Sequence, residues 1–240
     1  MSRHGRPLGL RRARGRWWDR VIPILRDAGH DAVAVANPLR GLAADARSVG
    51  DLLRTIDGPI LLVAHSYGGA VMTNVDAGAG DIAGLVYVDG FAPAPGESCF
   101  GLAAMFPGSM VGESTVRPVP RSDGTTDLYI AREAFHDVFC ADVPAPEAAL
   151  MAATQRPATQ EALVEPSGDR PLWRDVPSWF VIGGEDRVIP PELQRFEAQR
   201  AEAQRVLELP GASHAAAVSR PGAVAELILE AAASLRLAVA

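Results

Sequence analysis

Lysine is absent from this sequence of 240 residues, in which all 23 basic residues are arginines. The absence excludes enzymes that form a Schiff base with their substrate, pyridoxal phosphate enzymes, and phosphate-binding loops that end in Gly-Lys-Ser/Thr. Each of these needs the lysine amine, whose pKa and reach arginine does not reproduce.

Cysteine and long apolar runs are also scarce. Cys99 and Cys140 lie far apart, with no CxxC motif and no Cys/His cluster, which predicts two reduced thiols in a cytoplasmic protein and no structural metal. No apolar run reaches the roughly 18 residues of a membrane span. Residues 1–20 lack the apolar stretch of a secretory signal. We therefore expect a cytoplasmic protein without a membrane partner.

Charge is unevenly distributed. The net charge is −6, yet residues 1–20 carry seven arginines and a single acidic residue, Asp19. The remainder of the chain is acidic and offers no basic surface, so we expect no nucleic-acid partner. The length suits one α/β domain with a full hydrophobic core.

Strand-like and helix-like segments alternate along much of the chain. In residues 31–36 the β-branched valines alternate with alanines, as in a strand. Residues 59–65 form the continuous apolar run of a strand buried on both faces. This order predicts a mostly parallel sheet with helices on both faces. Further strands are expected at 85–89, 179–182 and 205–209, and helices at 18–25, 42–56, 68–79, 192–204 and 223–237.

The alternation stops over residues 91–177, a proline-rich stretch that is too long for a loop. We predict a helical cap over the sheet edge where ligands enter. The expected organisation is an atypical arginine-rich segment (1–16), the first part of the sheet domain (17–90), the cap (91–177), and the second part of the sheet domain (178–240).

Ser66 follows the apolar run 59–65 and has small residues two positions away on either side, Ala64 and Gly68. This is the pattern of a nucleophile elbow, a sharp strand-to-helix turn that lifts the serine hydroxyl above the sheet. The backbone N–H of Tyr67 would then donate to a developing oxyanion. His65 alternates to the opposite side of the strand, which favours a packing or hydrogen-bonding role.

A serine nucleophile needs a base and an orienting acid. Asp186 follows the predicted strand 179–182 and a Gly-Gly turn, and His214 follows strand 205–209 and a Pro-Gly turn. The order Ser66, Asp186, His214 is the one found on α/β sheets of this kind. Asp89 also follows a buried strand and is the alternative acid.

These motifs resemble the α/β-hydrolase superfamily, in the small serine-esterase branch that contains plant methylesterases, hydroxynitrile lyases and bacterial esterases. The resemblance extends from about Trp17 to the C-terminus. It implies an α/β-hydrolase fold with a cap, no cofactor, and hydrolysis of small carboxylic esters by a Ser66, His214 and Asp186 triad. The plant lyases are thought to need a lysine, which disfavours that activity here. The matching stretches are AHSYGG at 64–69, GEDRVIP at 184–190, GASH at 211–214 and WDRVIP at 18–23.

The N-terminus departs from the family pattern, in which a His-Gly turn after an N-terminal apolar strand supplies the second oxyanion donor. His4-Gly5 follows only three residues here, and residues 6–16 are rich in arginine, so we expect the N-terminal strands to be missing or divergent. The segment is a basic arm, a divergent oxyanion loop with the Arg6 N–H as donor, or the product of a misplaced start. The last interpretation is favoured, because out-of-frame text from GC-rich codons is rich in Arg, Gly, Pro and Ala.

An alternative function follows from this departure: a catalytically impaired hydrolase fold that binds a small ligand. For an active enzyme, the apolar composition of the cap favours short-chain or aromatic esters over charged ones.

Overall fold

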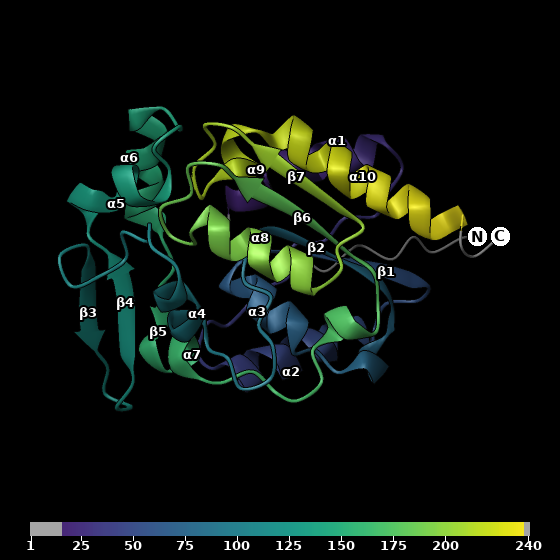
Figure 1. Ribbon diagram of the computed structural model, residues 1–240, viewed down its shortest axis with the longest axis horizontal. Coiled ribbons are helices and arrows are strands. Elements are labelled where there is room, and N and C mark those ends of the chain that lie inside the picture. The colour runs from purple at the N-terminus through teal and green to yellow at the C-terminus, as the bar shows by residue number, and fades with distance from the viewer. Residues whose placement is uncertain (1–15, 238–240) are drawn as a thin grey trace, which may run out of the picture.

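The computed structural model describes residues 16–237 of the chain. Four parallel strands form the central sheet in the order β1 (Pro59–Ser66), β2 (Asp81–Gly90), β6 (Ser178–Gly183) and β7 (Arg205–Leu209), as Figure 1 shows. Each corresponds to a strand expected from the sequence. Since all four run in the same direction, their carboxyl ends meet at one edge of the sheet.

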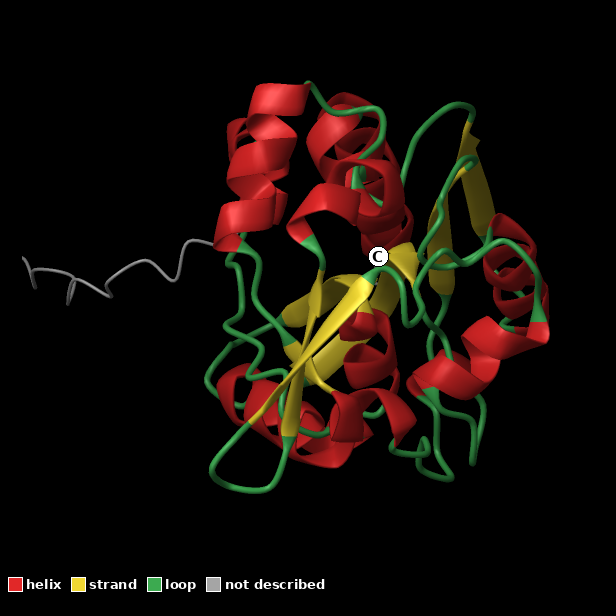
Figure 2. Cartoon of the chain, turned by 90° about the vertical axis from the view of Figure 1, so that its left-hand side faces the viewer, coloured by secondary structure: helices red, strands yellow, loops and turns green. Residues whose placement is uncertain are grey.

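Helices cover both faces of this sheet (Figure 2). Along β2, Leu85 and Tyr87 pack into one core cluster while Val86 and Val88 pack into the other, because successive side chains of a strand point to opposite faces. The first cluster includes residues of α2 (Leu42–Leu53), α3 (Tyr67–Thr73) and α8 (Pro191–Arg200), and the second includes residues of α1 (Val21–Asp27), α9 (Ala216–Ser219) and α10 (Pro221–Leu237).

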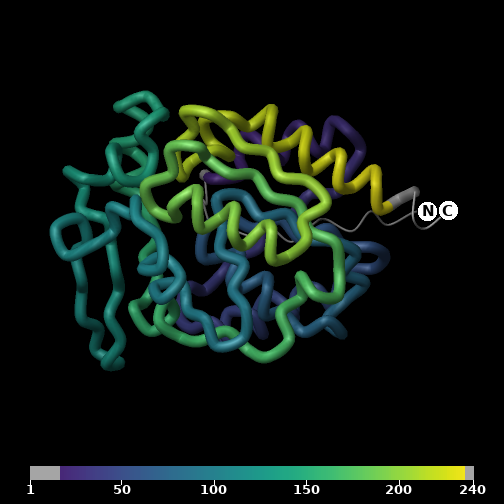
Figure 3. Tube along the Cα trace, viewed as in Figure 1, coloured from purple at the N-terminus to yellow at the C-terminus, as the bar shows by residue number. Residues whose placement is uncertain are grey.

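The insertion between β2 and β6 gathers at one end of the sheet, in teal to green in Figure 3. It is not purely helical, which corrects the sequence prediction. Proline discourages a strand assignment, yet Pro118 and Pro120 are tolerated because β3 is an edge strand. The helices are α4 (Cys99–Met105), α5 (Arg132–Phe139), α6 (Ala145–Thr154) and α7 (Gln160–Val164), and the antiparallel strands are β3 (Val116–Pro120), β4 (Thr126–Ile130) and β5 (Ala158–Thr159).

The strand predicted at residues 31–36 is not formed. Val33 and Val35 are 61% and 39% exposed, and no strand of the described chain pairs with this segment. A strand requires a hydrogen-bonded neighbour, which an alternating pattern cannot supply by itself. The prediction was wrong because it rested on the local alternation alone and took no account of whether a neighbouring strand was present. The prediction of missing or divergent N-terminal strands falls on residues 1–15, outside the described residues.

Within the described chain, β1 is an edge strand, although its apolar sequence is typical of an interior one. A cavity of about 2930 Å³ is lined by residues of many elements and includes a groove lined by residues 32–36 and by residues 61–66. One edge of β1 therefore presents backbone groups that pair with no described strand. This groove extends to the Ser66 end of β1.

Glu197 on α8 is a buried carboxyl group that contacts the first residues of the insertion after β2. One of its oxygens accepts the backbone N–H of Ala92 at 2.8 Å, and the other has no hydrogen-bond partner in the described chain. Burial raises the pKa of Glu197 from its usual value to about 8, against the opposing effects of that N–H and the nearby Arg200.

The raised pKa predicts a pH-dependent effect of Glu197→Gln. The folded state retains a proton that the unfolded chain loses above about pH 4.3, so Glu197 costs stability progressively as the pH rises toward 8. Glutamine does not ionise. We expect the melting temperature of the variant, relative to the parent, to be higher at pH 9 than at pH 4.5 by roughly 3–6 °C. Thermal unfolding at both pH values measures this, and an equal difference at the two values contradicts it.

Candidate functional site

Ser66 lies where β1 ends and α3 begins. Its backbone has φ 56° and ψ −130°, in the left-handed half of conformational space that residues with a side chain rarely adopt. Its carbonyl accepts the backbone N–H of Phe91 at 3.2 Å, which ties the turn to the residue after β2. Such strain persists only where the surrounding structure fixes it, and it is concentrated at functional sites.

Two glycines follow the serine, and their surroundings differ. A Cβ atom on Gly68 would lie 3.7 Å from the Cβ of Ala64, an ordinary contact. A Cβ atom on Gly69 would lie only 2.4 Å from the backbone oxygen of Phe91. The sequence pattern drew attention to Ala64 and Gly68, but the tightest backbone approach is at Gly69.

We therefore expect Gly69→Ala to lower the free energy of unfolding by about 2 kcal/mol or more, because backbone must move to admit the methyl group. Gly68→Ala is the matched control. It is expected to be neutral or slightly stabilising, since alanine has the higher helix propensity and its methyl group has room. Urea unfolding of the two variants measures the difference, and equal stabilities would show that the close approach at Gly69 has no cost.

His214 connects Ser66 to Asp186. Its Nε2 lies 2.9 Å from Oγ of Ser66, and its Nδ1 lies 2.8 Å from Oδ2 of Asp186. The histidine is fully buried, and burial lowers its pKa to about 3, so the ring is neutral at neutral pH. A neutral imidazole is the form that accepts a proton.

The Asp186 carboxylate is held by three further donors. Oδ1 accepts the backbone N–H groups of Val188 and Ile189 at 2.8 and 2.9 Å, and Oδ2 accepts Nε2 of Gln194 at 2.9 Å. Burial raises the pKa of Asp186, and these donors oppose the rise by favouring the charged form. Sequence reasoning missed Gln194, which has no motif of its own and reaches Asp186 only because α8 packs back over the loop.

Asp89 lies beside this group of residues but has other partners. Its two oxygens accept the backbone N–H of Gly183 at 2.7 Å and that of Ala216 at 3.1 Å. It thus joins the loops that precede Asp186 and follow His214. Burial and the neighbouring Asp186 raise the pKa of Asp89. The acid that accepts the hydrogen bond from Nδ1 of His214 is Asp186 and not the alternative acid, Asp89.

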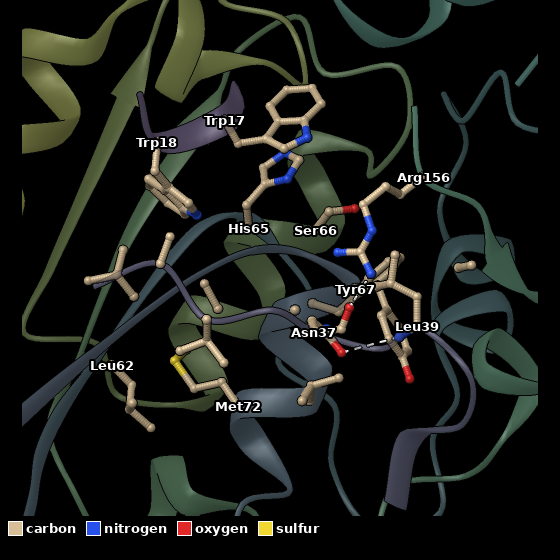
Figure 4. A pocket seen from close by; sticks show the side chains of 18 of the residues that line it. Trp17, Trp18, Asn37, Leu39, Leu62, His65, Ser66, Tyr67, Met72 and Arg156 are labelled. Atoms are coloured by element: carbon tan, nitrogen blue, oxygen red, sulfur yellow. Dashed lines mark hydrogen bonds between the residues drawn. The ribbon is translucent and has the colours of Figure 1, made fainter. Parts of the chain in front are cut away.

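His65 has the hydrogen-bonding role expected from the sequence. Its Nε2 donates to the carbonyl oxygen of His214 at 2.8 Å, and its ring stacks on Trp17 with centroids 4.8 Å apart. Figure 4 shows this stacked pair at one side of the pocket that contains Ser66. Burial and the nearby His214 lower the pKa of His65 to about 3, so it is uncharged at neutral pH.

Tyr67 opens α3, and its N–H belongs to the first turn, where backbone donors have no carbonyl partner within the helix. Its side chain donates to Oδ2 of the buried Asp45 at 2.9 Å, which links the turn after Ser66 to α2. Asp45 was not anticipated, since an acidic residue in the first turn of a helix is usually a surface feature. The other predicted oxyanion donor, Arg6, lies outside the described residues.

Solved structures with the same fold include three hydrolytic enzymes. Polyneuridine aldehyde esterase is 18% identical with a TM-score of 0.71, over 89% of this chain and 92% of that one. The pyrethroid hydrolase from Sphingobium faniae JZ-2 is 22% identical, with a TM-score of 0.67 over 90% and 92% of the two chains. The methylesterase MES16 from Arabidopsis is 18% identical, with a TM-score of 0.67 over 90% and 93%.

These similarities confirm the predicted α/β-hydrolase fold. No curated protein matches the sequence significantly. The sequence pattern of the alpha/beta hydrolase family matches residues 4–227, well over half of the chain, and the protein therefore belongs to that family.

Proposed function

We propose that this protein is a serine hydrolase that cleaves small carboxylic esters through an acyl-enzyme intermediate. The observation that carries the proposal is the continuous set of hydrogen bonds from Ser66 through His214 to Asp186, at the carboxyl edge of the central sheet. The esterases among its structural neighbours are consistent with it. The strained Ser66 turn lines the large cavity of this protein, as expected where a nucleophile elbow presents its hydroxyl to a substrate.

In the proposed mechanism, the neutral His214 removes the hydroxyl proton of Ser66 as its oxygen attacks the ester carbonyl. Asp186 fixes the Nδ1–H tautomer and stabilises the imidazolium that forms. The Tyr67 N–H donates to the oxyanion. His214 then protonates the leaving alcohol, and the same residue activates water to release the acid and regenerate Ser66.

A cytoplasmic location is part of the proposal. Cys99 and Cys140 are both buried and unpaired, as reduced thiols are in a reducing compartment. Within the described chain, no helix is both long and apolar enough to cross a bilayer.

Covalent labelling with a fluorophosphonate tests the function, because the reagent reacts only with a serine that is activated by its neighbours. We expect a single adduct on the peptide containing Ser66, lost in His214→Ala. Labelling elsewhere, or labelling that persists without His214, contradicts the proposal. A protein that binds esters without becoming labelled supports the alternative, in which the same pocket serves a small-ligand binder.

A further inference from the structure

Arg156 places a positive charge in the pocket of the proposed nucleophile. It lies between α6 and β5 and lines the same cavity as Ser66 and Tyr67. Figure 4 shows its side chain reaching into this pocket. Arg156 belongs to none of the hydrolase motifs, so no sequence pattern singled it out.

The charge of Arg156 is not neutralised within the described chain. Its Nη2 donates to the backbone carbonyl of Asn37 at 2.6 Å, and it forms no ion pair with a described residue. Arg20, which lines the same cavity, is instead paired with both oxygens of Glu147. A guanidinium has five N–H donors, so most of the capacity of Arg156 is left for a ligand.

The backbone on both sides of Arg156 is held in place. The Gln155 side chain accepts the N–H of Ile130 and donates to its carbonyl, both at 3.0 Å. After Pro157, Thr159 donates its N–H to the carbonyl of Leu39 at 3.1 Å. The backbone that carries Arg156 is thus fixed, and its exposed side chain is held by the hydrogen bond to Asn37, which lowers the entropy lost when a ligand binds.

We propose that Arg156 binds a free carboxylate on the substrate. The preferred substrates would then be small monoesters of dicarboxylic acids, in which the acyl chain carries a free carboxylate at the end opposite the ester group. The planar guanidinium matches a carboxylate in a bidentate geometry. Apolar residues of the same cavity, among them Phe139 and Leu163, would contact the hydrocarbon between the two groups. This inference rests on the proposed function and changes the expectation from cap composition, which favoured uncharged esters.

A kinetic comparison tests the substrate class. The ratio of kcat/KM for mono-p-nitrophenyl glutarate to that for p-nitrophenyl butyrate is measured in the parent, in Arg156→Met and in Arg26→Met. Arg26 is the matched control, since it lines the same cavity and also donates to a backbone carbonyl, that of Ala32. We expect the ratio to fall about tenfold or more in Arg156→Met only. An unchanged ratio in Arg156→Met overturns the inference.

A binding experiment separates this inference from the proposed function. Calorimetric titration of Ser66→Ala and of Ser66→Ala/Arg156→Met with monomethyl glutarate and methyl butyrate requires no turnover. We expect monomethyl glutarate to bind Ser66→Ala about tenfold more tightly than it binds the double variant. Equal affinities overturn the role of Arg156 even if Ser66 is the nucleophile. A difference in affinity without Ser66-dependent hydrolysis supports the carboxylate site and contradicts the esterase.

Discussion

Replacing Ser66 with alanine is expected to lower kcat/KM for p-nitrophenyl esters by roughly 10⁴-fold or more, to the background rate. The substitution removes the oxygen that lies 2.9 Å from Nε2 of His214 and leaves the imidazole without its proposed proton donor. His214→Ala is expected to have an effect of the same size, because residues that act as a unit are not additive. Steady-state kinetics with circular dichroism, as a check on folding, measure both.

The two aspartates provide a matched pair for the role of the acid. Asp186→Asn removes the carboxylate that contacts Nδ1 of His214 and favours the wrong tautomer, and we expect a loss of up to about 10⁴-fold in kcat. Asp89→Asn alters contacts with the backbone of Gly183 and Ala216 instead. Its main effect is expected on stability, with a far smaller loss in kcat. The opposite ranking would identify Asp89 as the acid.

Ser66→Ala with the activity of the parent would contradict the proposed mechanism outright. Because the strained Ser66 turn is kept by its neighbours, the variant is expected to fold, and its melting temperature serves as the control for this.

Replacing residues 1–16 with an apolar strand that ends in His-Gly is expected to raise kcat/KM by roughly 100- to 1000-fold. We expect the new strand to bind along the edge of β1 that pairs with no described strand, in the cavity that residues 32–36 also line. The turn after such a strand would bring a second N–H donor to the site, beside that of Tyr67. A single oxyanion donor contributes about this factor in serine hydrolases.

The same replacement is expected to raise stability. A strand in the groove would pair with β1 and give residues 31–36 a neighbour that no described strand supplies, so that Val33 and Val35 become buried. Burial of a valine side chain contributes roughly 1.5 kcal/mol or more. Hydrogen exchange of residues 31–36 and of β1 should slow in step with the rise in melting temperature.

A second replacement, ending in Ala-Pro instead of His-Gly, is the control. Proline has no N–H to donate, so this version is expected to gain stability with little gain in activity. If neither version changes stability or activity, the groove beside β1 is not a strand site. If the parent already has the kcat/KM of the His-Gly version, groups other than the N–H supplied by the new turn stabilise the oxyanion.

Much of the candidate site follows from local sequence. Ser66 ends a strand at a turn that small residues mark, and Asp186 and His214 each follow a strand and a glycine turn. These signals act within a few neighbouring residues. The carboxyl ends of parallel strands meet at one edge, so the convergence of the three was predictable as well. Hydrophobic periodicity in the same way predicts the four strands of the central sheet and the helices α1, α2, α3, α8 and α10, but not α9 or the helices of the insertion.

Other features depend on contacts between distant segments. Three features arise only when loops and helices pack together: the hydrogen bond of His214 to Asp186 instead of Asp89, the support of Asp186 by Gln194, and the presence of Arg156 in the same cavity as Ser66. Asp89 and Asp186 both lie near the end of a strand and have similar local signatures, yet the His214 ring contacts Asp186 while the backbone of Ala216 contacts Asp89.

The sequence by itself determined the α/β class of the protein, the turn at Ser66 and the order of its three candidate catalytic residues, because these depend on short-range patterns. The tertiary structure alone decided that residues 31–36 do not form a strand and that one edge of β1 pairs with no described strand. The physical reason is that strand formation requires backbone hydrogen bonds with a neighbour far away in the chain, and no local pattern shows whether that neighbour is in place.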